Sequence, residues 1–132
     1  MTKSTIIGAL LAGGESRRFG SHKAFALLQK KYFYEYAIDA LNGNVDQIYI
    51  VSHPSLEEQF RKSTSVPIIQ DVSEFQGSGP LAGIYTVMKK STSDWYVIIP
   101  CDMPFVTDKL IKQLISFTMD QRIDAVVPVI NG

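Results

Sequence analysis

A basic, glycine-rich segment follows the first apolar run of the chain, from Leu11 to Lys23 (LAGGESRRFGSHK). Paired glycines such as Gly13 and Gly14 let a backbone approach a ligand closely, and exposed N–H groups in such a loop can surround an anion. Arg17, Arg18 and Lys23 add positive charge to the same segment. This combination suits a polyphosphate. The alternative is an ordinary surface loop with solvated arginines.

Two common phosphate-binding motifs fit this segment poorly. A Walker-type loop ends in Gly-Lys-Ser/Thr, whereas Gly20 is followed by Ser21. The dinucleotide-binding fingerprint needs three closely spaced glycines and an acid near the end of the second strand, where this chain has Ser52. The segment therefore predicts a phosphate-binding loop of another kind.

A carboxylate follows the most apolar run of the chain: Asp102 lies in Pro100-Cys-Asp-Met-Pro104. A carboxylate at the end of a buried strand can hold a divalent cation that also binds phosphate oxygens, as Mg²⁺ does in many nucleotide sites. The alternative is an aspartate that forms a turn by accepting backbone N–H bonds. With the basic glycine loop on an adjacent strand, Asp102 completes a predicted site for a metal-bound nucleoside triphosphate.

A third polar segment contains Asp71 and ends in a glycine-rich stretch at residues 77–83. The glycines leave room for a base or a ribose against the backbone, and Asp71 could accept a hydrogen bond from either. A Gly-Pro turn before a helix is also ordinary structure, so this segment alone is weak evidence.

Apolar runs of strand length alternate with segments of helical period, which predicts one α/β domain over residues 1–132. We expect a doubly wound, mostly parallel sheet with helices on both faces. The predicted helix at 81–90 should turn Ile84, Tyr85, Val87 and Met88 inward, and Thr107 should cap the last predicted helix. Strands are expected at residues 6–11, 48–51, 66–69, 95–99 and 125–130, and further helices at 32–41 and 56–62.

Composition excludes several classes of protein. Thirteen basic and thirteen acidic residues leave no net charge, which argues against nucleic acid as the main partner. Six of the basic residues, against one acid, lie within residues 1–31, so an anion site is expected there. The single cysteine, Cys101, rules out an intrachain disulfide. No stretch approaches the ~20 apolar residues of a membrane span, so a cytoplasmic protein without membrane contacts is expected.

The motif Leu11-Ala-Gly-Gly-x-Ser-x-Arg-x-Gly-x-x-Lys23 resembles the opening of nucleotidyltransferases with a Rossmann-like fold. Gly79-Pro-Leu-Ala-Gly83 and Pro100-Cys-Asp-Met-Pro-Phe105 look like the molybdenum cofactor guanylyltransferase branch of that family. The resemblance covers nearly the whole chain. It implies an enzyme that transfers GMP from Mg²⁺-GTP to the molybdopterin cofactor and releases pyrophosphate.

The resemblance also implies roles for individual residues. Lys23 would contact the phosphates, Asp71 the nucleotide, and Asp102 both the nucleotide and Mg²⁺. Arg18, Lys23 and Asp102 would be the catalytic residues. Residues that match nucleotide-binding or other functional motif positions are Leu11, Ala12, Gly13, Gly14 and Gly83.

Two departures from the family pattern bear on these expectations. Ser52 stands where the family can place an asparagine, which puts a base contact there in doubt. Lys30-Lys31-Tyr32 replaces the usual Gly-Lys-Pro turn. Family members extend further than Gly132, so a C-terminal part is expected to be missing and to contain the acceptor site.

Proteins that mature molybdoenzymes are a further expected class of partner. A cytidylyl- or sugar-phosphate nucleotidyltransferase and a non-catalytic nucleotide-binding module remain alternatives.

Overall fold

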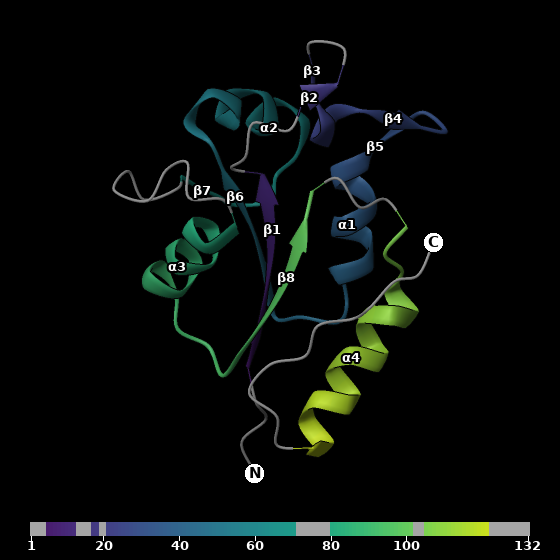
Figure 1. Cartoon of the computed structure of the whole chain (residues 1–132), viewed down its shortest axis with the longest axis vertical. Helices are drawn as coiled ribbons and strands as arrows, with labels where there is room; N and C mark the ends of the chain where they lie inside the picture. Colours follow the sequence, from purple (N-terminus) through teal and green to yellow (C-terminus); the bar gives the residue numbers. More distant parts are fainter. Residues whose placement is uncertain (1–4, 13–16, 19–20, 71–79, 102–104, 122–132) are drawn as a thin grey trace.

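The centre of the protein is a parallel sheet (Figure 1). A computed structural model describes the backbone of residues 5–12, 17–18, 21–70, 80–101 and 105–121, and the side chains of 5–12, 24–70, 83–101 and 105–117. Within these residues the sheet has four strands in the order β7-β6-β1-β8, and every neighbouring pair is parallel. The strands are β1 (Ile6–Ala12), β6 (Gln47–Ser52), β7 (Ile68–Gln70) and β8 (Trp95–Pro100). The predicted strand at 125–130 lies outside the described residues.

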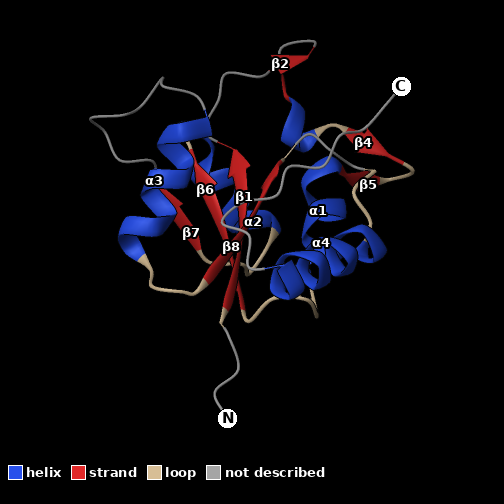
Figure 2. Cartoon of the chain, turned by 60° about the horizontal axis from the view of Figure 1, so that its bottom comes forward, coloured by secondary structure: helices blue, strands red, loops and turns tan. Residues whose placement is uncertain are grey.

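Helices cover both faces of this sheet (Figures 1 and 2). Alternate residues of β1 point to opposite faces, as the pleat of a strand requires. Leu10 packs with α1 and α4 in one apolar cluster, whereas Ala9 packs with Val87 of α3 in another. This arrangement confirms the predicted α/β architecture with a mostly parallel sheet. The helices are α1 (Phe33–Leu41), α2 (Glu57–Ser63), α3 (Pro80–Lys90) and α4 (Asp108–Gln121).

The chain between β1 and α1 contains more regular structure than the glycine-rich loop that the sequence predicts. Its described parts form two short antiparallel hairpins, β2-β3 and β4-β5, joined by a 3₁₀ turn, η1. In the second hairpin Gln29 and Lys30 have φ of 54° and 67°, the left-handed values that a tight hairpin turn requires. The elements are β2 (Arg17–Arg18), β3 (Ser21–His22), η1 (Lys23–Phe25), β4 (Leu27–Leu28) and β5 (Lys31–Tyr32).

The helix predictions are largely confirmed, with one correction on α3. The Thr107 hydroxyl oxygen accepts the Leu110 N–H at 3.2 Å, so Thr107 caps α4 as predicted. In α3, Val87 is fully buried, but Tyr85 and Met88 are 42% and 54% exposed. The prediction for these two was wrong because Gly83 and Val87, which lie one helical turn apart, face the sheet instead.

No described helix is both long and apolar enough to cross a membrane.

Candidate nucleotide-binding site

The carboxyl ends of the parallel strands meet at one edge of the sheet. Ala12 pairs with Ser52, and Ser52 pairs with Gln70, at the last positions of β1, β6 and β7. On the other side of β1, Leu11 pairs with Pro100, the last residue of β8. Loops that leave this edge of an open parallel sheet form the usual ligand crevice. The segments that begin at residues 13, 53, 71 and 101 therefore all start from one edge of the sheet.

The junction of β1 and β8 brings two predicted motifs to the same place. The Cys101 N–H donates to the Leu11 carbonyl at 3.0 Å, so pairing continues one residue past β8. Cys101 is buried, and Asp102 is the next residue in the chain. The prediction that the glycine loop and the Asp102 segment leave adjacent strands is confirmed by this pairing. Gly13, Gly14 and Asp102 themselves lie outside the described residues.

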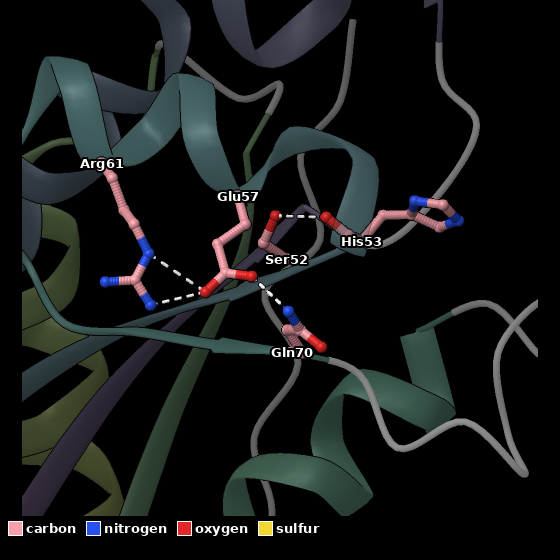
Figure 3. A network of polar contacts seen from close by, with 5 residues as sticks. All are labelled: Ser52, His53, Glu57, Arg61 and Gln70. Atoms are coloured by element: carbon pink, nitrogen blue, oxygen red, sulfur yellow. Dashed lines mark hydrogen bonds and ion pairs between the residues drawn. The ribbon is translucent and has the colours of Figure 1, made fainter.

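On the opposite side of β1, the backbone of His53 continues the pairing with β6. The His53 N–H donates to the Ala12 carbonyl at 3.3 Å. Ser52 is fully buried, and its hydroxyl donates to the His53 carbonyl at 2.8 Å (Figure 3). A buried hydroxyl whose proton is already donated has no free donor for a ligand in this conformation. The doubt about a base contact from Ser52 thus has a physical reason, because its one donor is used within the protein.

Leu11 and Gly83 are the two predicted nucleotide-binding positions that the structure places in direct proximity. Gly83 is buried on the sheet-facing side of α3. A Cβ atom built on Gly83 would lie 2.7 Å from Leu11 Cδ2. Glycine therefore allows α3 to approach the end of β1 closely, at the position next to Ala12. This gives Gly83 a packing role at the edge of the site.

Arg18 and Lys23 are predicted to bind phosphate, and the structure describes the backbone of both. Arg18 lies in β2 and pairs with Ser21 of β3, and Lys23 begins η1 directly after this hairpin. The residues that follow Lys23 anchor it, because Ala24 and Phe25 are buried. Phe25 packs against aromatic rings with centroid distances of 4.7–5.5 Å; these rings are Tyr32, Tyr34 and Phe60. The glycine loop is thus joined to the core at its distal end.

The end of β7 is held by a side-chain network that the sequence analysis missed (Figure 3). One carboxylate oxygen of Glu57 accepts from Arg61 Nε at 3.1 Å and from a terminal nitrogen of the same guanidinium at 2.5 Å. The other oxygen accepts from the Gln70 side-chain amide. Arg61 first, and Gln70 second, lower the pKa of the Glu57 carboxyl. Gln70 directly precedes Asp71, which lies outside the described residues.

Only part of this network could be predicted from the sequence. Glu57 and Arg61 are four residues apart on a helix, a spacing that favours an ion pair. The bond between Glu57 and Gln70 spans 13 residues and joins a helix to a strand. No local pattern indicates such a pair.

Asp102 is the predicted metal ligand. Among the residues whose structure is described, no group of three or more His, Cys, Asp or Glu side chains could hold a metal ion. A hard cation such as Mg²⁺ takes few protein carboxylates when it also binds substrate phosphates. Asp102, which directly follows Cys101 in the chain, is a single carboxylate of the kind that this mode of binding requires.

Comparisons with known proteins identify the type of domain. A family model described as a MobA-like NTP transferase domain matches residues 8–132. A relative from Halalkalibacterium halodurans, named probable molybdenum cofactor guanylyltransferase, is 47% identical over 128 residues, which are 96% of this chain and 64% of that protein. A relative of the same name from a Geobacillus strain is 48% identical over 120 residues, 91% of this chain and 61% of its own length. The chain thus spans less than two thirds of these relatives.

Solved structures give the same architecture. CMP:2-keto-3-deoxy-manno-octonic acid synthetase, in complex with CTP, matches 90% of this chain and 49% of its own with a TM-score of 0.74 at 20% identity. Molybdopterin-guanine dinucleotide biosynthesis protein A from Archaeoglobus fulgidus matches 82% of this chain and 53% of its own, with a TM-score of 0.64 at 27% identity. A manganese complex of the Mycobacterium tuberculosis protein Rv0371c matches 87% of this chain and 60% of its own, with a TM-score of 0.65 at 17% identity.

Proposed function

Because the chain belongs to the MobA-like NTP transferase family, we propose that it forms the nucleotide-binding part of a molybdenum cofactor guanylyltransferase. The observation that carries the proposal is the junction of β1 and β8, where the Cys101 N–H bonds to the Leu11 carbonyl. This junction starts both the glycine loop and the Asp102 segment at one edge of the sheet. The names of relatives at 47% and 48% identity support the choice of reaction.

The reaction is the transfer of GMP from GTP to the terminal phosphate of molybdopterin cofactor. A phosphate oxygen of the acceptor forms a bond to the α-phosphorus, and the bond from that phosphorus to the oxygen bridging to the β-phosphate breaks. The electron pair of the broken bond leaves with pyrophosphate. The attacking phosphate is already ionised at neutral pH, so no general base is required. Catalysis then depends on positioning and charge neutralisation.

The glycine loop provides the phosphate contacts in this proposal. Backbone N–H groups of Gly13 and Gly14 surround phosphate oxygens, and Arg18 and Lys23 neutralise their charge. The burial of Ala24 and Phe25 directly after Lys23 supports this role, because a charge on an anchored segment loses less freedom on binding. Leu11, Ala12 and Gly83 form the adjoining wall, and Asp71 contacts the nucleoside.

Asp102 is the residue that would hold Mg²⁺. Bound there, the ion would neutralise phosphate charge in the transition state. The manganese complex of the structurally similar Rv0371c protein is consistent with a divalent-metal site in this fold. The acceptor is molybdopterin cofactor, and molybdoenzyme maturation proteins are the proposed partners that receive the product.

The test is isothermal titration of the chain with GTP, CTP, ATP and UTP in the presence of Mg²⁺. We expect GTP to bind most tightly. A preference for CTP would replace the guanylyl assignment by a cytidylyl one, the second candidate, which the structural similarity to the CTP-bound synthetase favours.

An Asp102→Asn variant tests the metal role with the same titration. The variant should lose the Mg²⁺-dependent part of GTP affinity and keep its melting temperature. Binding that is equally tight with and without Mg²⁺ in the unmodified chain would indicate a non-catalytic nucleotide-binding module.

A further inference from the structure

His53 occupies a central place at the carboxyl edge of the sheet. It directly follows β6, the strand between β1 and β7, and its N–H donates to the Ala12 carbonyl. Its side chain is partly exposed, in contrast to the fully buried Ser52. His53 is therefore the first residue after β6, and its side chain is accessible at this edge of the sheet.

The imidazole of His53 is held in one orientation by its Nδ1 atom. Nδ1 accepts the backbone N–H of Ser55 at 3.1 Å and lies 2.8 Å from the Ser55 hydroxyl oxygen. These contacts cap the short 3₁₀ turn η2 (Pro54–Leu56). An Nδ1 that accepts an N–H carries no proton, so the neutral ring has its proton on Nε2. The ring thus presents one oriented hydrogen-bond donor.

The donor at Nε2 is not used by the described part of the structure. The ring points away from the Glu57 carboxylate and from Gln70 (Figure 3). Among the described residues, the side-chain hydrogen bonds of His53 all involve Nδ1. A ring that is anchored on one side and has a donor on the other is preorganised for a ligand acceptor.

We propose that His53 is a specificity-determining residue that donates from Nε2 to an acceptor of the guanine base, O6 or N7. This inference rests on the proposed function, because it assumes that the nucleotide binds at this edge. The order of the strands supports this position for the base. The phosphate loop and Asp102 follow β1 and β8, whereas His53 follows β6 on the other side of β1. If the phosphates bind beside the ends of β1 and β8, as in the proposed function, the nucleoside end would lie on the side of β6 and β7.

A donor at this position distinguishes purines by their chemistry. Guanine presents two acceptors on one edge, O6 and N7, whereas adenine carries an amino group in place of O6. A fixed N–H that faces O6 of guanine would face the amino hydrogens of adenine. A contact to N7 would instead be shared by both purines and lost with 7-deaza-GTP. The two acceptors can therefore be separated with nucleotide analogues.

Two substitutions separate the donor from the cap. His53→Asn keeps a side-chain oxygen that can accept the Ser55 N–H, since asparagine is a good N-cap residue, but it lacks a donor at the Nε2 position. His53→Gln places an amide N–H near the Nε2 position and gives up the cap. A comparison of the two variants shows whether the donor or the cap matters for the choice of nucleotide.

The experiment is titration of the wild-type chain and both variants with the Mg²⁺ complexes of GTP, ATP and 7-deaza-GTP, alongside thermal melting. We expect His53→Asn to melt like the wild type. The variant should bind GTP about three- to tenfold more weakly, which corresponds to the loss of one hydrogen bond. The loss should be absent with ATP if O6 is the acceptor, or absent with 7-deaza-GTP if it is N7. His53→Gln should retain most of the wild-type affinity for GTP even where its melting temperature falls.

Two results would overturn the inference while leaving the proposed function in place. One is unchanged GTP affinity in His53→Asn. The other is an equal loss with GTP, ATP and 7-deaza-GTP, which would place the contact at the ribose or the phosphates. Failure of the proposed function has a different signature, since the wild-type chain would then bind no Mg²⁺-GTP, and the inference would fall with it.

Discussion

A Cβ atom at position 83 would lie 2.7 Å from Leu11 Cδ2, so α3 packs against Leu11 with no room for a Cβ while Leu11 keeps its present conformation. The conflicting atom is the end of a flexible side chain, not the backbone of β1. Leu11 can therefore move to accommodate a larger residue at position 83. Such a movement would displace a side chain next to Ala12, at the edge of the proposed nucleotide site. Packing between α3 and β1 and the proposed nucleotide site thus meet at this pair.

We expect Gly83→Ala to affect nucleotide binding more than stability. Alanine gains about 1 kcal/mol over glycine inside a helix. A displaced, off-rotamer Leu11 costs about 0.5–1.5 kcal/mol, so the two effects nearly cancel. The free energy of unfolding should change by less than about 1 kcal/mol, as measured by urea denaturation, while GTP affinity falls.

A second substitution identifies the cause of that loss. Leu11→Val removes the Cδ atoms that meet the new methyl group. If the clash is responsible, the double variant should bind GTP better than expected from the sum of the two single changes. Strict additivity would contradict the proposed coupling between the two residues.

Lys23→Ala should weaken the binding of GTP far more than that of guanosine. The ammonium group acts as a compact point charge on the triphosphate, which guanosine lacks. Isothermal titration with both ligands measures the difference. The matched control is Lys109→Ala, which removes the same charge from an exposed position of α4. Equal losses for GTP and guanosine would mean that Lys23 supports the loop and does not bind the phosphates.

The pH dependence of stability should report the Glu57 network. Arg61 and Gln70 lower the pKa of this carboxyl in the folded protein, so the carboxylate stabilises the fold above the unfolded pKa of about 4.3. That contribution is lost as the pH falls through the folded pKa. Glu57→Gln should therefore be less stable than the wild type at pH 7, with a difference that shrinks at acidic pH.

The neighbouring pair Glu58–Lys62 provides the control for this measurement. It has the same spacing on α2, but both side chains are largely exposed. Exposed pairs contribute little to stability. Glu58→Gln should therefore cost less at pH 7 than Glu57→Gln. Urea denaturation at several pH values compares the variants, and equal costs would show that Gln70 adds nothing to the network.

Lys30→Gly should stabilise the hairpin between β4 and β5. Lys30 has a φ of 67°, in the left-handed region, which costs a residue with a Cβ about 1–2 kcal/mol. Part of the gain is offset by the greater freedom of glycine in the unfolded chain. A net gain of about 0.5–1 kcal/mol in the free energy of unfolding is expected by denaturation. Lys30→Ala, which removes the charge but keeps the Cβ, should show no comparable gain.

The sequence by itself determined the elements whose pattern is local. The apolar runs of β1, β6 and β8 were predicted to within a residue or two, as was the cap of α4 at Thr107, because each depends on residues only a few positions apart. The motif at residues 11–23 indicated phosphate chemistry by the types of its residues alone. The position of Asp102 after an apolar strand suggested its placement near that motif.

The tertiary structure decided what depends on residues far apart in the chain. Periodicity placed Tyr85 and Met88 of α3 inside, but the sheet selects the face that contains Gly83 and Val87, because Gly83 permits the closest approach to Leu11. The Glu57–Gln70 bond and the anchored ring of His53 likewise form only when α2, β6 and β7 are assembled. The physical reason is that side-chain type determines what a residue can bind, whereas packing between distant segments determines what it meets.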